Sequence, residues 1–350
     1  MKLLSSCAPA ACAGKRVVVR ASLNVPINDG DTKQKFRIAA LKDTVDFLCD
    51  AGAQVALLGH MGRPDGAVDE ALSMAQLTDD ITRILDRPVV FADACTGARV
   101  EEVLSGTQPG TLVLLENVRF HSAETSTDAV VRKAFAAEIA QNFDVYVNDA
   151  FSVCHRAHAS ITELATALPS YAGMQLSREV ETLSRVRTSP AHPAVLVIGG
   201  AKIATKLPLI RAVESLYDAV LVGGKVANEA LDEQIAFTDN VMVPQDFVGE
   251  RYDIGPATVE AFVAQIMRAQ TVVWNGPMGW YEKEAYAHGT RRIVEALKDT
   301  PAFTVVGGGE SIEALEHYNA IDAIDFVSTG GGAMLAFMAG DTLPGIAALE

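Results

Sequence analysis

Short apolar runs recur along the chain, and segments with helical spacing separate them. In the first half the runs occupy residues 16–20 (RVVVR), 54–60 (QVALLGH), 111–117 (TLVLLEN) and 145–151 (VYVNDAF). In the second half they occupy residues 194–200 (AVLVIGG), 219–224 (AVLVGG), 271–276 (TVVWNG), 303–309 (FTVVGGG) and 326–332 (FVSTGGG). Continuous apolar runs of this length between helices are typical of parallel strands covered on both faces. The pattern predicts an α/β fold.

One intervening segment shows the alternation clearly. Ile38, Leu41, Val45 and Leu48 recur at helical spacing, and Gly52 supplies a stop just before the run that starts at residue 54. Strand, helix and strand in succession are the units of a doubly wound parallel sheet. The stretch from Pro169 to Pro193 holds one polar helix between its Pro- and Gly-containing ends, so we expect it to be a hinge helix between two such domains.

The two halves differ in the residues that come directly after their strands. First-half strands are followed by His, Arg, Asn and Asp side chains, whereas second-half strands are followed by double or triple glycine. Ligands of doubly wound sheets bind at the carboxyl ends of the strands. A rim of glycine lets backbone N–H groups approach a phosphate or nucleotide closely, and a rim of side chains can recognise a small anion. Two different rims predict two ligands.

Composition narrows the class of protein. The chain has 350 residues, of which 49% are hydrophobic and 21% charged, as expected for a globular protein with substantial cores. The formal net charge of −15 argues against a general nucleic-acid or membrane-surface binder, because both need a positive face. The acidic balance still allows a cleft that gathers arginines for an anionic substrate.

Cysteine use and the N-terminus favour a cytoplasmic location. The five cysteines form no C-x-x-C pair, and the odd count fits reduced thiols better than a disulfide framework. The N-terminal stretch has no continuous apolar core of the kind found in signal peptides, and no run approaches membrane-spanning length. We expect a soluble cytoplasmic protein that binds neither membranes nor nucleic acids.

A cationic cluster comes after the first-half strands. A single histidine or arginine is more often a surface or packing residue. The candidates listed below differ from that default because they share a position after the end of a strand. Guanidinium groups form bidentate hydrogen bonds with carboxylate and phosphate, so several converging arginines predict a small, multiply charged acid as ligand. His155 and His158 lack the carboxylate or cysteine that would complete a zinc site, and little supports Cys154 as a nucleophile. The candidates are Asn24, Arg37, His60, Arg63, Arg119, His121, Arg156 and His158.

The second half suggests a phosphate chain as ligand. The stretch GGAKIATK (199–206) is not a P-loop, and no dinucleotide-binding G-x-G-x-x-G occurs in the glycine runs. If helical, Lys202 and Lys206 face the same side one turn apart, either as a solvated pair or as two cations aimed at a phosphate. The stretch GGGES (307–311) would add a helix N-terminus, and Glu310 could hold a magnesium ion beside nucleotide phosphates.

These motifs together resemble the phosphoglycerate kinase family. The matching segments occur in the family's order and cover almost the whole chain: RASLNVP, FRIAAL, GHMGRP, LLENVRFH, YVNDAFSVCHRAHAS, GGAKIATK, VWNGPMGWYE, GGGES, STGGGA and LPGIAAL. The resemblance implies a monomeric, two-lobed, hinge-bending α/β enzyme that transfers phosphate between 1,3-bisphosphoglycerate and ADP, giving 3-phosphoglycerate and Mg-ATP. It implies a phosphoglycerate-binding domain at 1–172, a nucleotide-binding domain at 173–336 and a C-terminal tail, 337–350, that returns to the first domain.

The resemblance also implies roles for individual residues. Phosphoglycerate would be held by Ser22, Asn24, Arg37, His60, Arg63, Arg119 and Arg156. Arg37, Lys202, Gly308 and Gly309 would act on the transferring phosphoryl group. The nucleotide and its magnesium ion would be held by Gly200, Lys202, Lys206, Gly223, Gly224, Asn275, Pro277, Glu282, Gly307, Gly308, Gly309, Glu310 and Ser311, with Glu282 on the ribose and Glu310 on the metal.

Several departures from the family pattern keep a second hypothesis open. Ser22, Thr205 and Glu310 each stand where the family usually has aspartate, Ala336 stands for a glutamate, and the segment 225–273 is short. A weakly active or inactive relative that binds phosphoglycerate or nucleotide in a regulatory role would share the motifs. A nicotinamide-dependent dehydrogenase would share the fold class, but the missing dinucleotide motif and the arginine cluster argue against it.

Overall fold

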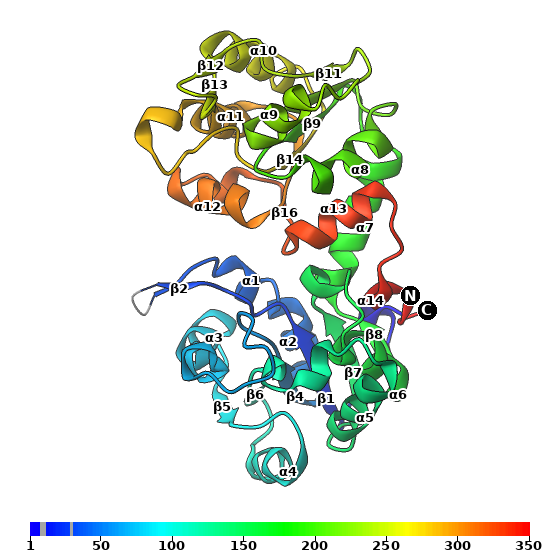
Figure 1. Ribbon diagram of the computed structural model, residues 1–350. Coiled ribbons are helices and arrows are strands. Elements are labelled where there is room, and N and C mark those ends of the chain that lie inside the picture. Colours follow the sequence, from blue (N-terminus) through cyan, green and yellow to red (C-terminus); the bar gives the residue numbers. More distant parts are fainter. Residues whose placement is uncertain (8–11, 29–30) are drawn as a thin grey trace. The chain divides into compact units, whose positions relative to one another are not determined.

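The computed structural model describes residues 1–7, 12–28 and 31–350, which divide into two compact units (Figure 1). Unit 1 comprises Met1–Glu179 with the tail Thr342–Glu350, and unit 2 comprises Val180–Asp341. The boundary lies inside helix α7 (Met174–Thr188), later in the chain than the expected boundary at 172. The tail that belongs to unit 1 likewise begins later than residue 337.

Unit 1 is built on a six-stranded parallel sheet. Its central strand β1 pairs with β4 on one side and with β7 on the other, with Val17 opposite both Val55 and Val145. Because β1, β4, β6 and β7 are almost entirely buried, the sheet must be covered on both faces. In sheet order the strands are β5 (Val89–Ala92), β6 (Leu112–Leu115), β4 (Gln54–Leu58), β1 (Arg16–Ala21), β7 (Val145–Asp149) and β8 (Ser170–Ala172).

The helical spacing from residue 38 onward produces two helices rather than one. The chain turns between α1 and α2, and α2 is followed by Gly52 at φ +79°, a left-handed conformation that glycine adopts without strain. The helices of unit 1 besides the first part of α7 are α1 (Phe36–Ala39), α2 (Lys42–Asp50), α3 (Thr78–Leu85), α4 (Gly97–Gly106), α5 (Ala129–Ala140), α6 (Leu164–Ala167) and α14 (Pro344–Ala347). A short hairpin joins β2 (Ile27–Asn28) to β3 (Asp31–Thr32).

The tail forms hydrogen bonds with both early and late segments of unit 1. Lys2 N donates to the carbonyl of Leu349 over 3.2 Å, and Gly345 N donates to the carbonyl of Cys154 over 2.9 Å. The two chain ends therefore lie side by side (Figure 1).

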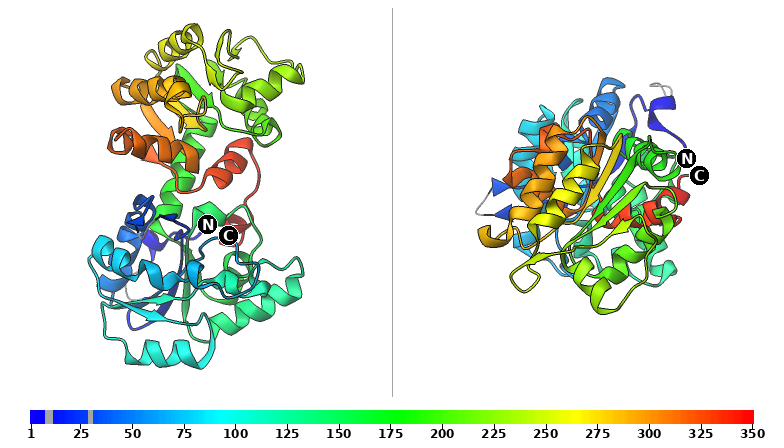
Figure 2. Two further views of the ribbon diagram at one scale, coloured as in Figure 1. Left: turned by 60° about the vertical axis from the view of Figure 1, so that its left-hand side comes forward. Right: turned by 90° about the horizontal axis from the view of Figure 1, so that it is seen from above.

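Unit 2 repeats the architecture with a second six-stranded parallel sheet and helices on both sides (Figure 2). The strands in sheet order are β11 (Val241–Met242), β10 (Ala219–Val222), β9 (Ala194–Ile198), β14 (Thr271–Asn275), β15 (Phe303–Val306) and β16 (Phe326–Val327). The helices are α8 (Ile203–Val213), α9 (Gly224–Asp232), α10 (Pro256–Ile266), α11 (His288–Asp299), α12 (Gly309–His317) and α13 (Gly331–Ala339). A small antiparallel ladder joins β12 (Phe247–Val248) to β13 (Asp253–Ile254).

Each unit has its own apolar core. In unit 2 the core includes the fully buried Trp274 and Phe262, and in unit 1 it includes Val17, Leu57 and Leu114. The predicted α/β fold with two parallel sheets is confirmed. Within the described ranges, no helix has both the length and the apolar character needed to cross a bilayer.

Candidate functional sites

The predicted anion-binding residues of unit 1 follow neighbouring strands of one sheet. Ser22 and Asn24 follow β1, His60 and Arg63 follow β4, Arg119 follows β6, and Arg156 lies beyond β7. Strands β6, β4, β1 and β7 are consecutive in the sheet and parallel. Their carboxyl ends therefore meet at one edge, which is where doubly wound sheets bind ligands.

Hydrogen bonds tie these loops together. Gly62 N donates to Asn24 Oδ1 over 2.9 Å, and Arg119 Nη1 donates to the carbonyl of Gly62 over 2.7 Å. The hydroxyl oxygens of Ser22 and Ser152 are 2.6 Å apart. Ser22, where the resemblance leads one to expect aspartate, thus connects the loop after β1 to the segment after β7.

The cations of this edge are close enough to affect one another. Burial and then the charge of Arg20 lower the pKa of Arg119 to about 10, and the charges of Arg156 and Arg63 act in the same direction. The buried carboxylate of Glu124 acts in the opposite sense. Positive groups that destabilise one another are stabilised when a multiply charged anion binds between them. The arrangement is that of a binding site for a small acid.

Arg37 belongs to the same cluster. It lies on α1 and is nearly buried, and its charge is among the causes that hold the pKa of His60 well below its usual range. The guanidinium also lies 5.8 Å from the ring centroid of Phe36. The structure therefore brings Arg37 to the edge that carries the other candidates, although no strand directly precedes it.

His60 is held in one protonation state by a residue that the motifs did not single out. Arg20 Nη2 lies 2.9 Å from His60 Nδ1, and both side chains are buried. A guanidinium can only donate, so Nδ1 accepts and the proton of the neutral imidazole sits on Nε2. Burial and the charge of Arg20 both lower the pKa of His60, which keeps the ring neutral.

Behind His60 lies a buried polar network. Arg20 Nε donates to Ser160 Oγ over 2.9 Å, and Ser160 Oγ donates to Glu124 Oε1 over 2.7 Å. Arg20, Ser160 and Glu124 are all fully buried. In the sequence, this network was signalled by Arg20, a charged residue inside an otherwise apolar strand. A buried arginine needs polar partners, so its position implied that such partners exist.

The remaining candidates of unit 1 have other surroundings. His158 is buried with Nδ1 3.8 Å from Glu124, and burial together with the neighbouring arginines lowers its pKa to about 3. His121 stacks against Phe135 of α5 with ring centroids 4.7 Å apart. Burial raises the pKa of the Cys154 thiol to about 12, which keeps it protonated and a poor nucleophile.

In unit 2 the glycines after the strands allow backbones to meet directly. Gly200 N donates to the carbonyl of Pro277 over 2.7 Å, and Gly224 N donates to the carbonyl of Met278 over 3.0 Å. A Cβ on Gly199 would lie 2.1 Å from the carbonyl oxygen of Pro277, so no side chain fits there. The loops after β9, β10 and β14 therefore form one bare, closely packed surface.

The two lysines of this surface differ in environment. Lys202 immediately precedes α8 with φ +69°, so the condition under which the two lysines would face the same side of one helix does not hold for Lys202. Lys206 is within α8 and nearly buried, and its Nζ donates to Asn275 Oδ1. Burial lowers the pKa of Lys206 to about 8. Thr205, where the resemblance leads one to expect aspartate, donates from its hydroxyl to the carbonyl of Lys202 over 2.8 Å.

The third glycine segment begins helix α12. Gly308 has φ +106°, and Gly309 is the first residue of the helix, where an added Cβ would meet nothing within 4 Å. Glu310 lies in the first turn. Ser311 is fully buried and its Oγ accepts from Gly276 N over 2.6 Å, so it supports the turn after β14.

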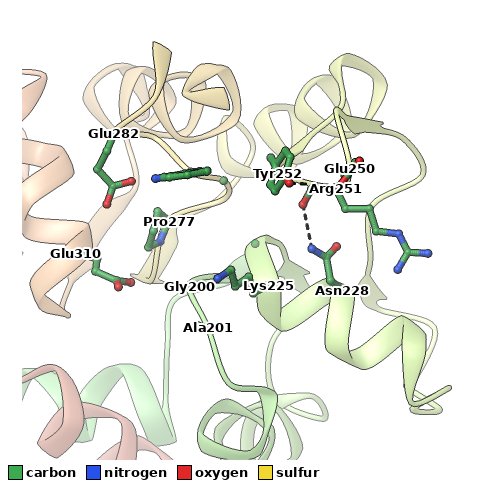
Figure 3. A pocket seen from close by; sticks show the side chains of 13 residues that line it. Gly200, Ala201, Lys225, Asn228, Glu250, Arg251, Tyr252, Pro277, Glu282 and Glu310 are labelled. Carbon is green, nitrogen blue, oxygen red and sulfur yellow. Dashed lines mark hydrogen bonds between the residues drawn. The ribbon is translucent and has the colours of Figure 1, made fainter. Parts of the chain in front are cut away.

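These loops border a cavity of about 430 Å³, within the usual size range of ligand pockets (Figure 3). Glu282 and Glu310 lie on one side of it, and Tyr252 and Asn228 on the other. Five predicted residues line it: Gly200, Gly224, Pro277, Glu282 and Glu310. The motifs did not predict the other lining residues, Ala201, Lys225, Asn228, Glu250, Arg251, Tyr252, Gly279 and Trp280. The other predicted nucleotide-site residues do not line it: Lys202, Lys206, Gly223, Asn275, Gly307, Gly308, Gly309 and Ser311.

The carboxylates at the cavity could bind a metal ion only together with a ligand that supplies further oxygen atoms. No group of three potential metal-ligating side chains occurs within the described part of the chain. Magnesium commonly binds through one or two carboxylates and completes its shell with water and substrate phosphate. Glu310, on the cavity wall at a helix N-terminus, suits that arrangement.

Comparison with known proteins identifies the family. The sequence model described as "Phosphoglycerate kinase" matches residues 8–248 and 233–341. The chain belongs to the phosphoglycerate kinase family. The two matches overlap inside the segment 225–273, which the sequence indicated to be short.

Individual phosphoglycerate kinases match over nearly their whole length. The enzyme of Moorella thermoacetica is 37% identical over 381 aligned positions, covering 96% of each chain, and that of Salinibacter ruber is 39% identical over 389 positions, covering 96% of each. The crystal structure of the Pyrococcus horikoshii phosphoglycerate kinase superimposes with a TM-score of 0.88 at 29% identity, covering 100% of this chain and 98% of that one. The Coxiella burnetii structure superimposes with a TM-score of 0.79 at 30% identity.

Proposed function

We propose that this chain catalyses reversible phosphoryl transfer from 1,3-bisphosphoglycerate to Mg-ADP, giving 3-phosphoglycerate and Mg-ATP. The observation that carries the proposal is the pairing of two unlike rims in a phosphoglycerate kinase fold. One sheet edge gathers mutually repelling arginines, and the other presents bare glycine loops around a cavity.

On unit 1, the cationic edge holds the three-carbon acid. Arg63, Arg119 and Arg156 bind its phosphate and carboxyl oxygens with two-pronged hydrogen bonds. His60 donates from Nε2 as a neutral group, and Ser22 and Asn24 contact the uncharged part of the ligand. Arg37 faces the phosphoryl group that is transferred.

On unit 2, the nucleotide occupies the glycine-lined cavity. Glu282 accepts hydrogen bonds from ribose hydroxyls, and Lys206 and the amides of Gly307, Gly308 and Gly309 bind phosphates. Lys202 stabilises the phosphoryl group during transfer. Glu310, together with the nucleotide phosphates, would hold a magnesium ion, which would supply positive charge beside the phosphate oxygens.

Phosphoryl transfer requires the protein to position the two reactants and to supply positive charge. It requires no covalent intermediate with the protein. The migrating phosphoryl group passes through a loose transition state with charge spread over its three outer oxygens. Arg37 and Lys202 lower the energy of that state because they are fixed before the reaction begins. Transfer between ligands held on separate units also requires that the units bring them in line and exclude water, which would otherwise accept the phosphoryl group.

Nothing in the comparisons favours the hypothesis of an inactive regulatory relative. The substitutions at Ser22 and Thr205 retain hydrogen-bonding partners, and Glu310 retains a carboxylate on the cavity wall. The monomeric state and the cytoplasmic location belong to this proposal as expectations.

Turnover of purified protein tests the function. The chain should be produced in a host lacking its own phosphoglycerate kinase, and ATP formation should be followed with 1,3-bisphosphoglycerate generated in a coupled assay. We expect turnover on the order of 1–10³ per second, the range of most enzymes. Calorimetric binding of 3-phosphoglycerate and Mg-ADP without turnover would instead favour the hypothesis of a weakly active or inactive relative.

A further inference from the structure

A buried carboxylate accompanies the cations of unit 1 but has no part in the proposed mechanism. Glu124 lies in the short turn Ser122–Thr125, shortly after Arg119, and its side chain is fully buried. Burying a charged group costs free energy unless hydrogen bonds and opposite charges compensate for it. The partners of Glu124 therefore indicate what the carboxylate does.

Both oxygens of this carboxylate accept hydrogen bonds from Ser160. The backbone N–H of Ser160 donates to Glu124 Oε2 over 2.8 Å, and its hydroxyl donates to Oε1 over 2.7 Å. His158 Nδ1 is 3.8 Å from Oε1, which is beyond the reach of a hydrogen bond. Burial raises the pKa of Glu124, whereas the charge of Arg20 and the bonds from Ser160 lower it. Two accepting oxygens near a guanidinium fit the ionised carboxylate.

Ser160 also binds Arg20, which reaches His60. Arg20 Nε donates to Ser160 Oγ over 2.9 Å, and Arg20 Nη2 donates to His60 Nδ1 over 2.9 Å. Burial lowers the pKa of Arg20, and the charge of Glu124 opposes this effect most strongly. Without that negative charge the guanidinium would be a buried cation among other cations, which is costly. Glu124 therefore stabilises the group that orients His60.

These bonds connect the ends of four neighbouring strands. Arg20 is in β1, and His60 follows β4. Glu124 lies beyond β6, and Ser160 lies beyond β7. The four strands are consecutive in the sheet, and the candidate arginines of the anion site lie on the loops that follow them. The chain of bonds therefore limits how far those cations can move relative to one another.

We propose that Glu124 is a positioning residue for the acid substrate, which acts through Ser160 and Arg20 to hold the cationic side chains of unit 1 at a fixed spacing before the acid binds. The inference rests on the proposed function, because it concerns the three-carbon acid of that reaction. Groups that are ordered in advance need not be ordered at the moment of binding, which improves affinity. Loss of the carboxylate should therefore weaken binding of the acid and leave binding of the nucleotide unchanged.

Steady-state kinetics tests the assignment. Glu124→Gln keeps the shape of the side chain but removes the charge near Arg20. KM for 3-phosphoglycerate should rise about ten-fold or more, while KM for Mg-ATP changes less than about two-fold. Glu138→Gln is the matched control, since Glu138 is an exposed carboxylate on α5 of the same unit, and it should leave both KM values at the wild-type level. An unchanged KM for 3-phosphoglycerate in folded Glu124→Gln overturns the inference, as does an equal rise in both KM values.

Two further variants separate positioning from folding. Glu124→Asp restores the charge and should recover part of the lost affinity. Ser160→Ala removes the hydroxyl between Glu124 and Arg20 but keeps the carboxylate, and it should also raise KM for 3-phosphoglycerate. If Glu124→Gln does not fold, Ser160→Ala decides the question, and an unchanged KM there overturns the inference. The ¹⁵N resonance of His60 Nδ1 should shift in Ser160→Ala, and an unchanged resonance would overturn the route through Arg20.

Binding measured without turnover keeps this inference separate from the function. Calorimetric titration with 3-phosphoglycerate alone requires neither nucleotide nor catalysis. If the protein shows no turnover but Glu124→Gln has a higher Kd than the wild type, the function is overturned and the positioning role stands. If the protein turns over and the two Kd values are equal, the function stands and the positioning role is overturned.

Discussion

Arg20 donates from Nη2 to Nδ1 of His60 across 2.9 Å, and this bond sets which nitrogen of the imidazole carries the proton. The guanidinium has no acceptor, so the proton of the neutral ring must lie on Nε2. Arg20 is in turn bonded to Ser160, which is bonded to Glu124. A buried chain of polar groups thus prepares a neutral hydrogen-bond donor at a site for an anion.

This relationship predicts that His60 does not titrate in the working range. Burial and the charge of Arg20 lower its pKa, so the ring stays neutral from about pH 6 to about pH 8. Its ¹H–¹⁵N spectrum should show one bare and one protonated ring nitrogen across that range. KM for 3-phosphoglycerate should show no step from this histidine. Appearance of an imidazolium spectrum near pH 6 would contradict the assignment.

Arg37 and Lys202 should each contribute mainly to turnover. In the proposed mechanism both face charge that develops during transfer, so Arg37→Ala or Lys202→Ala should lower kcat about 10²- to 10³-fold, as does removal of one preorganised charge-stabilising donor. Arg83→Ala is the matched control, since Arg83 is an exposed side chain paired with Asp80 on the surface of α3. Near-normal kcat in either variant, measured in the coupled assay, would refute the assigned role.

Nucleotide affinity should weaken as the pH rises through about 8. Burial lowers the pKa of Lys206 to about 8, so the ammonium that would bind phosphate is present below that pH and lost above it. Calorimetric Kd values for Mg-ADP should therefore increase above about pH 8, by at most ten-fold per pH unit. Lys206→Met should bind weakly at every pH and lack this increase. An equal increase in the variant would assign the titration to another group.

The backbone contact at Gly276 should be intolerant of any side chain. Gly276 has φ +96°, and an added Cβ would lie 2.2 Å from the carbonyl oxygen of Gly199. Gly276→Ala should therefore destabilise the protein by about 1–3 kcal/mol or more, because it combines backbone strain with a clash. Gly309→Ala is the control, since a Cβ there meets nothing within 4 Å. Thermal unfolding of the two variants should separate them clearly, and equal melting temperatures would contradict the packing.

Parts of both candidate sites could be predicted from the sequence because many of their residues come directly after strands. Arg119 and Gly200 could be placed from the chain because a parallel sheet brings the carboxyl ends of its strands to one edge. Arg20 was missed because it lies inside a strand rather than after one. Tyr252 was missed because it belongs to a segment between elements, and only the fold brings it to Trp280, which is far along the chain.

The order of apolar runs, helices and glycine turns was enough to determine an α/β chain with two parallel sheets, because burial on both faces requires continuous apolar strands. The tertiary structure alone decided the tautomer of His60, the depressed pKa of Lys206 and the contact between the rings of Tyr252 and Trp280. Each of these depends on how deeply a group is buried and which distant groups touch it. Neither quantity is a property of the neighbouring residues in the chain.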